Sequence, residues 1–357
     1  MQFDVAPRPD PTPEPRRREI LAAPGFGTHF TDHTAVIDWT AEEDWQNPRV
    51  EAYGPISLDP AASVLHYAQE VFEGMKAYRH DDGGIWTFRP FANAERMNRS
   101  ARRMALPELD EELFVRSLEE LLAVDRDWVP SGEGEALYLR PFMFASEAFL
   151  GVRPAKEVSY RVIASPAGNY FGGELKPVRI WVSRDYVRAA PGGTGAAKTG
   201  GNYAGSLVAQ AQAAEHGCDQ VLFLDPLQDN AVEELGGMNV FLVTSDGRLV
   251  TPALTGTILE GITRDAVITL AEDRGMTVEQ RRVTLDEWAA GVEDGTVTEV
   301  FACGTAAVIT PIGELVDGER TIASTGTGEV TQGIREELLG VQTGAVGDRH
   351  GWMHRLV

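Results

Sequence analysis

Apolar and polar positions follow two different spacings along the first half of the chain. Short runs rich in β-branched and aromatic residues, such as 34–39 and 160–164, predict strands, because neighbouring side chains of a strand point to opposite faces. The stretches 91–104 and 111–129 instead repeat their apolar residues at helical spacing and predict helices. We therefore expect an α+β domain over residues 19–166.

The second half also mixes the two spacings. Strands are expected at 178–183, 220–224, 239–244 and 248–251, and helices at 204–216 and 264–274. The turn at 245–247 contains Asp246 and Gly247, a pair typical of hairpins. Thr284 and Glu287 form a capping-box pattern that predicts a helix ending at Gly291 or Gly295. The fold class is thus α/β (α+β) with two domains, the second at 177–357 after a turn-rich connection at 167–176.

The N-terminal segment carries prolines at positions 7, 9, 11, 13 and 15, interspersed with charged residues. This composition favours extended, solvated chain over packing. We predict a flexible, non-catalytic tail over residues 1–18.

Charge and cysteine content narrow the function classes. The 357 residues carry a formal net charge of -22, which disfavours nucleic acid and anionic membranes as partners because both would be repelled. Cys218 and Cys303 lie far apart without metal-like spacing, so no disulfide and no metal site is expected, and a reducing cytoplasm is the expected compartment. No apolar run approaches the ~20 residues that a membrane helix needs.

One lysine stands between glycine-rich arms in the stretch 192–203, just before a predicted helix. Glycines let a bulky ligand approach the backbone, and a lysine kept from water becomes a better nucleophile. Lys198 could therefore bind a carbonyl cofactor such as pyridoxal phosphate as a Schiff base. On this segment alone, a solvated lysine in a flexible surface loop is the alternative.

Two loop-to-helix or strand-to-turn segments, 259–263 and 302–306, could bind a phosphate through free N–H groups. Either could also be an ordinary turn. Arg96 could add a positive charge, but Arg99, Arg102 and Arg103 compete with it on a helix face that could simply be solvated.

Other candidate side chains could recognise a ring or a substrate. Glu234, beside Glu233 ahead of a predicted strand, could keep a pyridine nitrogen protonated, which strengthens an electron-sink cofactor; the alternative is a pair of surface glutamates in a turn. Arg140 stands in an apolar run and suggests either carboxylate recognition or a buried ion pair. Five aromatic residues could line a pocket or belong to the core: Phe30, Tyr67, Phe72, Tyr138 and Tyr170.

Taken together, these motifs resemble the branched-chain amino-acid aminotransferases, pyridoxal-phosphate enzymes of the D-amino-acid aminotransferase-like fold (fold type IV). The resemblance runs from Gly25 to Trp352. It rests on GTHFTDH at 27–33, HY at 66–67, FEGMKA at 72–77, FRP at 88–90, RM at 96–97, YLRP at 138–141, Lys198 with GGNY at 200–203, ELGGMN at 234–239 and GTA at 304–306.

The resemblance implies a role for each motif. Lys198 would bind pyridoxal phosphate covalently, Tyr203 would bond the ring hydroxyl oxygen, and Glu234 would pair with the pyridine nitrogen. The phosphate would be held by Arg96, Ile262, Thr263 and Thr305. The substrate side chain would lie among Phe30, Tyr67, Phe72, Tyr138 and Tyr170, with Arg140 for the distal carboxylate of glutamate, and the α-carboxylate would lie against Gly237, Thr305 and Ala306.

Two positions depart from the family pattern. Some relatives have threonine where this chain has Gly237, so a hydroxyl that could touch the α-carboxylate is missing. Animal members carry paired cysteines where this chain has Ala307 and Thr310, so no thiol redox switch of that kind is expected.

The implied reaction is a reversible ping-pong transamination between L-leucine, L-isoleucine or L-valine and 2-oxoglutarate, with amino acids and 2-oxo acids as the small-molecule partners. A homodimer is expected, since relatives complete their sites with a loop from the partner. The alternatives are a D-amino-acid transaminase or an aminodeoxychorismate lyase of the same fold, or a pyridoxal-phosphate-binding protein without turnover.

Overall fold

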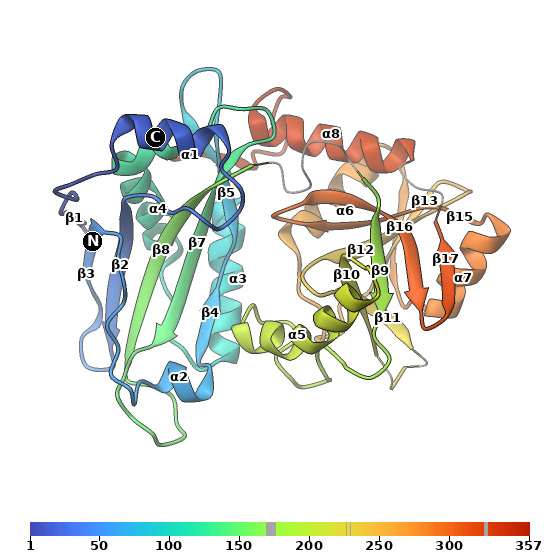
Figure 1. Ribbon diagram of the computed structural model, residues 1–357, viewed down its shortest axis with the longest axis horizontal. Helices are drawn as coiled ribbons and strands as arrows, with labels where there is room; N and C mark the ends of the chain where they lie inside the picture. The colour runs from blue at the N-terminus through green and yellow to red at the C-terminus, as the bar shows by residue number, and fades with distance from the viewer. Residues whose placement is uncertain (169–175, 226, 229, 325–327) are drawn as a thin grey trace. The chain divides into compact units, whose positions relative to one another are not determined.

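The computed structural model describes residues 1–168, 176–225, 227–228, 230–324 and 328–357. The chain divides into two compact units (Figure 1). Unit 1 contains Met1–Gly173, Ala197–Gly200 and Gly340–Val357, and unit 2 contains Glu174–Ala196 and Gly201–Leu339. Among the described helices, none combines the length and the apolar character that crossing a membrane requires.

Unit 1 is built on one mostly antiparallel sheet in the order β1-β3-β2-β8-β7-β5-β6-β18, with β4 paired to β7. The strands are β1 (Asp4–Val5), β2 (His33–Thr40), β3 (Asp44–Ala52), β4 (Glu70–Phe72), β5 (Met75–Arg79), β6 (Ile85–Phe88), β7 (Ala136–Ala145), β8 (Glu157–Ala167) and β18 (Met353–Arg355). The helices are α1 (Glu14–Ala22), α2 (Ser63–Tyr67), α3 (Pro90–Arg103), α4 (Glu111–Asp125) and the 3-10 turn η1 (Arg126–Trp128).

Helices α3 and α4 confirm the two helices predicted from apolar spacing in the first half. Asp110 caps α4 by accepting a hydrogen bond from the Leu113 N–H at 3.0 Å. One face of α4 is buried, including Phe114 and Leu118, and packs in the unit 1 core with Tyr160 of β8. The predicted strands at 34–39 and 160–164 lie within β2 and β8, which pair with each other.

The N-terminal segment forms regular structure, although most of its side chains are exposed, so the prediction of a flexible tail is wrong. Strand β1 pairs with β3, and Phe3 is buried in the unit 1 core. The proline pattern misled because proline fits the first turn of a helix, where its missing N–H costs nothing. Pro13 is the N-cap residue of α1, and a further proline lies in the first turn of that helix.

Unit 2 is built on a second sheet in the order β11-β10-β9-β16-β15-β12-β13-β14, with β17 paired to β16. The strands are β9 (Val178–Val182), β10 (Gln220–Asp225), β11 (Ala231–Leu235), β12 (Asn239–Thr244), β13 (Arg248–Pro252), β14 (Thr277–Arg281), β15 (Val297–Gly304), β16 (Val308–Asp317) and β17 (Arg320–Ala323). The helices are α5 (Gly200–Glu215), α6 (Ile262–Asp273), α7 (Leu285–Asp294) and α8 (Glu329–Thr343), of which Gly200 and the residues of α8 from Gly340 on belong to unit 1.

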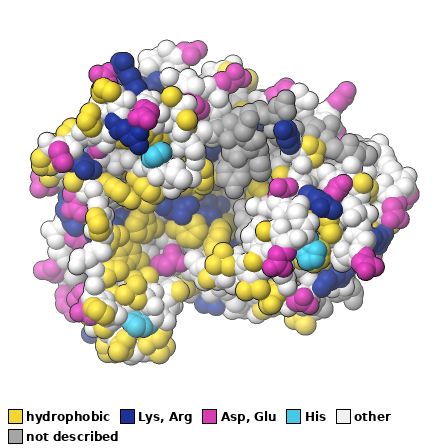
Figure 2. All heavy atoms as spheres, in the orientation of Figure 1, with side chains coloured by type: hydrophobic (Ala, Val, Ile, Leu, Met, Phe, Trp, Pro, Cys, Tyr) yellow, Lys and Arg dark blue, Asp and Glu magenta, His cyan; other side chains and the backbone are white. Residues whose placement is uncertain are grey.

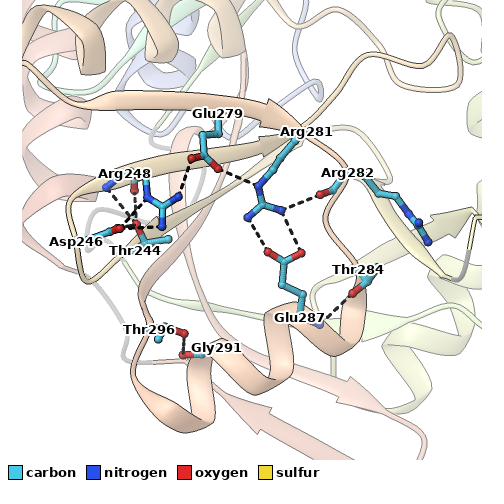
Figure 3. Close-up of polar contacts among 10 residues, drawn as sticks. All are labelled: Thr244, Asp246, Arg248, Glu279, Arg281, Arg282, Thr284, Glu287, Gly291 and Thr296. Atoms are coloured by element: carbon cyan, nitrogen blue, oxygen red, sulfur yellow. Dashed lines mark hydrogen bonds and ion pairs between the residues drawn. The ribbon is translucent and has the colours of Figure 1, made fainter.

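Local turn and cap chemistry confirms two predictions in unit 2. Strands β12 and β13 form the predicted hairpin, with Gly247 at a φ of 81° in its turn. Helix α7 begins after Thr284, whose hydroxyl accepts the Glu287 N–H (Figure 3). It ends at Gly295 in the left-handed conformation. Of the two predicted ends, Gly291 and Gly295, the second is correct.

The division into units differs in two places from the predicted domains. The boundary between Gly173 and Glu174 falls inside the expected connection at 167–176. However, Ala197–Gly200 and Gly340–Val357 belong to unit 1. The candidate lysine therefore packs with the first unit, although it lies in the second half of the sequence.

Candidate functional site

Lys198 is held through both of its backbone polar groups within unit 1. Its N–H donates to Ser100 Oγ at 2.9 Å, and its carbonyl accepts the Phe72 N–H at 3.0 Å. Ser100 is fully buried on α3 and also donates to the Arg96 carbonyl at 3.0 Å. The lysine side chain itself is half-buried, so its backbone is fixed while its amine can reach a ligand.

The Phe72 ring joins Lys198 to two of the predicted substrate residues. Lys198 Nζ lies 4.9 Å and Arg140 Cζ lies 4.7 Å from the centroid of this ring. Arg140 Nη2 donates to Tyr138 Oη at 3.0 Å, while Arg140 Nε is buried without a hydrogen-bond partner among the described residues. The structure thus brings Lys198, Phe72, Tyr138 and Arg140 together.

A glycine sets the space that Tyr138 occupies. A Cβ added to Gly74 would lie 2.1 Å from Tyr138 Oη, far closer than atoms in contact can approach. The glycine of the FEGMKA motif therefore allows the tyrosine hydroxyl to reach Arg140.

Arg96 forms a buried ion pair that sequence reasoning missed. Its Nε and Nη2 donate to the two carboxylate oxygens of Glu73 at 2.8 and 2.7 Å, and both residues are almost fully buried. Glu73 belongs to the FEGMKA motif, but its partner lies on another element. The competing Arg99 pairs with Glu95 one turn away on the exposed face of α3, which singles out Arg96 as the buried cation.

The remaining predicted pocket residues of unit 1 have other described contacts. Phe30 stacks on Tyr53 with ring centroids 5.1 Å apart, and Tyr67 at the end of α2 donates to the Leu150 carbonyl. Tyr170 lies outside the described residues.

In unit 2, Glu234 lies within β11 and is 2 % exposed, so the alternative of surface glutamates in a turn is wrong. Its Oε1 is 2.8 Å from Arg188 Nη1 and accepts the Leu259 N–H at 2.8 Å. Arg188 is equally buried, and no pattern in its surroundings singled it out. The ion pair keeps a buried negative charge available for a positively charged partner.

The N-terminus of α6 lies beside this carboxylate. Leu259 accepts from Asn239 Nδ2 at 3.1 Å, and the same amide approaches Glu234 Oε2 at 3.5 Å. A Cβ on Gly261, the N-cap residue of α6, would lie 2.0 Å from Asn239 Oδ1. A side chain at Gly261 would displace the Asn239 amide from its contacts with Leu259 and Glu234. Ile262 and Thr263 follow as the first helical residues, whose N–H groups have no helical acceptors.

The turn between β15 and β16 meets the same region of unit 2. A Cβ on Gly304 would lie 3.1 Å from Met238 Cγ and 3.4 Å from the Gly237 carbonyl, so the turn carrying Thr305 and Ala306 lies against 237–238. The nearest atom to a Cβ at Gly237 would be Tyr203 Cε1 at 3.9 Å. Unit 2 therefore gathers Tyr203, Glu234, Gly237, the α6 N-terminus and this turn.

These residues fit the phosphorylated pyridine cofactor expected from the sequence. In unit 2, Glu234 is a buried carboxylate for a ring nitrogen, and the first turn of α6 supplies N–H groups for a phosphate. In unit 1, Lys198 supplies an amine beside Arg140, whose Nε is buried without a described partner. Each unit thus offers groups of the chemistry that such a cofactor or its substrates require.

Comparison with known proteins agrees with this chemistry. The family model described as "Amino-transferase class IV" matches residues 70–315. The chain is 57% identical over 362 residues to a branched-chain-amino-acid aminotransferase of Mycolicibacterium smegmatis, and 56% identical over 362 residues to one of Mycobacterium tuberculosis (H37Rv). Each alignment covers 100% of this chain and 98% of the relative.

Solved structures show the same similarity. The branched-chain amino acid aminotransferase of Escherichia coli matches with a TM-score of 0.75 at 28% identity, covering 90% of this chain and 100% of that one. The branched-chain amino acid aminotransferase of Thermobaculum terrenum, solved in its PLP-form (holo-form), matches with a TM-score of 0.71 at 25% identity, covering 90% of this chain and 98% of that one.

Proposed function

Because the chain belongs to the class IV aminotransferases, and among them to the branched-chain-amino-acid aminotransferases, we propose that Lys198 is its catalytic residue. The reaction is a reversible exchange of the amino group between L-leucine, L-isoleucine or L-valine and 2-oxoglutarate. The observation that carries the proposal is the shared Phe72 ring, which joins the lysine amine to the Arg140 cation.

Lys198 has two tasks in this proposal. When bound, pyridoxal phosphate supplies an electron sink for the Cα of the amino acid. The Lys198 amine would hold the cofactor covalently, and as a free amine it would take the proton from Cα of the amino acid as a general base. The hydrogen bonds to Ser100 and Phe72 hold the lysine backbone for this transfer.

Glu234 and Tyr203 would act on the cofactor ring. Glu234 would hold the pyridine nitrogen in its protonated form, and the ion pair with Arg188 fixes the position of this carboxylate. Tyr203 would bond the ring hydroxyl oxygen. The phosphate would be held by Arg96, Ile262, Thr263 and Thr305. The position of Ile262 and Thr263 at the N-terminus of α6 supports their role. The buried ion pair with Glu73 orients Arg96.

Substrate recognition requires one pocket to accept both apolar and acidic side chains. Phe72 and Tyr138 provide apolar surface, while Arg140 would bind the distal carboxylate of glutamate. Its buried Nε, without a hydrogen-bond partner among the described residues, supports this assignment. Phe30, Tyr67 and Tyr170 are proposed to complete the pocket, and Gly237, Thr305 and Ala306 to receive the α-carboxylate.

The test combines the visible absorption of the bound cofactor with a glutamate-forming assay. L-Leucine should convert the cofactor band of the wild-type protein, whereas L-aspartate and D-alanine should not. Lys198→Ala should lose the band and at least ~10⁴-fold in kcat, because it removes both the covalent link and the base. Full activity of Lys198→Ala would contradict the assignment, and a band that only D-alanine changes would favour a D-amino-acid transaminase.

We further propose that the chain forms a homodimer in the cytoplasm. Large apolar side chains are exposed on α2 and on the loop between β7 and β8, including Leu65, Leu150 and Val152. Figure 2 shows hydrophobic side chains gathered over this end of unit 1. A partner subunit would cover them. The two free, buried thiols of Cys218 and Cys303 support a reducing compartment.

A further inference from the structure

Glu70, the first residue of β4, contacts the segment that directly follows the lysine. Its Oε1 accepts hydrogen bonds from the Gly200 N–H and, at 3.2 Å, from the Thr199 hydroxyl. Gly200 is the first residue of α5, where a helix leaves its N–H groups without helical acceptors. Thr199 is 1 % exposed, so its hydroxyl is bonded in a site that water hardly reaches.

Strand β4 holds the lysine segment at two points. Residues two apart in a strand share a face, so Glu70 and Phe72 both face this segment while Val71 is buried on the other side. The Phe72 N–H bonds the Lys198 carbonyl, and Glu70 bonds the two residues after it. Strand β4 is itself anchored by its antiparallel pairing with β7 from Glu70 to Phe72.

The state of the Glu70 carboxylate suits an acceptor. Burial is the largest effect and leaves the pKa of Glu70 above its ordinary value, while the hydrogen bonds from Gly200 and Thr199 and the nearby Arg140 charge act in the opposite direction. An ionised carboxylate or a carboxamide can accept both hydrogen bonds through one oxygen.

We propose that Glu70 is a positioning residue for the transamination: it fixes Thr199 and Gly200 and thereby sets the direction from which the Lys198 amine reaches the substrate Cα. This inference rests on the proposed catalytic role of Lys198. It extends that role by assigning to Glu70 the task of holding the two residues that follow the lysine. Misplacement of a reacting group by about 1 Å can cost about 10²-fold in rate.

Three substitutions at this position separate geometry from charge. Glu70→Ala removes both hydrogen bonds and should lower kcat about 10- to 100-fold, with the KM for L-leucine changed less than about threefold. Glu70→Gln keeps Oε1 as an acceptor and should restore kcat to within about threefold of wild type. Glu70→Asp keeps the charge but shortens the reach by one methylene, so its kcat should fall nearly as far as that of Glu70→Ala.

Glu299 offers a matched control. Its carboxylate accepts the Val330 and Thr331 N–H groups at 3.1 and 2.8 Å and the Thr331 hydroxyl at 2.7 Å at the start of α8, an arrangement similar to that of Glu70. Glu299→Ala should lower the melting temperature at least as much as Glu70→Ala while leaving kcat unchanged. The comparison separates loss of stability from loss of positioning.

Amide hydrogen exchange of the cofactor-free protein gives a readout independent of activity. The Gly200 amide should exchange at least about tenfold faster in Glu70→Ala than in wild type and near the wild-type rate in Glu70→Gln. The proposal would be overturned if the Gly200 amide of Glu70→Ala exchanged at the wild-type rate, or if Glu70→Ala or Glu70→Asp kept the wild-type kcat. It would also be overturned if the kcat of Glu70→Gln were as low as that of Glu70→Ala. If Glu70→Ala does not fold, Glu70→Asp decides. Activity of Lys198→Ala would instead refute the catalytic role of the lysine, whatever Glu70 does.

Discussion

The Asp32 carboxylate forms hydrogen bonds both with Thr12 of the N-terminal segment and with Trp128 in the core of unit 1. Its carboxylate accepts the Thr12 N–H at 3.0 Å, the Thr12 hydroxyl at 2.7 Å and Trp128 Nε1 at 3.0 Å. Burial alone would raise the pKa of Asp32, but these hydrogen bonds outweigh it, and the pKa lies below its ordinary value of 3.8. The ionised form therefore stabilises the folded state.

Replacement of the Asp32 carboxylate should lower the free energy of unfolding by an amount that depends on pH. Since the pKa is lowered on folding, the stabilisation is present at pH values above 3.8 and is lost as the pH falls through the folded-state pKa. Asp32→Asn should lower the free energy of unfolding by about 1–2 kcal/mol at pH 7, and by less as the medium becomes acidic. Urea unfolding at several pH values measures this; a difference that does not change with pH would contradict it.

Arg188 and Glu234 depend on each other because both are buried. Arg188→Met should lower the free energy of unfolding by about 3–5 kcal/mol, since it leaves the Glu234 charge without its arginine. Adding Glu234→Gln should recover part of that loss. Denaturant unfolding of the two single variants and the double variant measures the coupling, and strictly additive effects would show that the pair is not coupled in this way.

Sequence reasoning identified candidate residues of the site more readily than their partners. Lys198 and Glu234 stand in short motifs whose chemistry can be judged locally. Glu73 and Arg188 acquire their importance from ion pairs with residues distant along the chain, and local patterns carry no information about such contacts.

At the scale of elements, helix α7 shows how completely local signals can specify a boundary. Figure 3 shows Thr284 bonded to Glu287 at its start, while the Glu287 carboxylate pairs with Arg281 at 2.6 and 3.1 Å. Gly295 at its end has a φ of 80°, a conformation that favours glycine. The N-terminal segment shows the opposite case, because its order comes from Asp32, His33 and β3, which lie elsewhere in the sequence.

Removing the cap hydroxyl should destabilise the protein by a predictable amount. Thr284→Ala leaves the Glu287 N–H without its acceptor and should lower the free energy of unfolding by about 1 kcal/mol. The same change at the exposed Thr321 of β17 serves as a control and should cost less than half of that. Equal effects at the two positions, measured by denaturant unfolding, would show that the cap contributes nothing specific.

At the scale of the whole molecule, net charge opposes association between protein molecules, whereas exposed apolar surface favours it. Acidic and basic side chains are interspersed over the visible face, and the net charge of -22 opposes non-specific association (Figure 2). The exposed apolar residues on α2 and on the loop between β7 and β8 form a limited exception. This combination suits one specific contact better than general aggregation.

The proposed homodimer can be tested by mass. With a chain mass of 38.9 kDa, light scattering should give about 78 kDa for the wild type, twice the chain mass. Leu150→Asp should shift the protein toward the monomer, because a charge buried in an apolar contact is strongly unfavourable. Val346→Asp changes an exposed apolar residue elsewhere in unit 1 and should leave the mass unchanged. A wild-type mass equal to that of one chain would exclude the dimer.

Unit 1 is completed by the last residues of the chain. Strand β18 pairs with β6, and Gln342 accepts a hydrogen bond from the buried Tyr78 hydroxyl at 3.0 Å. Gly340–Val357 follows unit 2 in the sequence and is therefore synthesised after it, so the sheet of unit 1 cannot be completed before unit 2 has been made. All of unit 2 must therefore be translated before unit 1 can finish folding. A nascent chain stalled before residue 340 should keep the β6 edge open, and cells under folding stress should need chaperones for this protein chiefly during that interval.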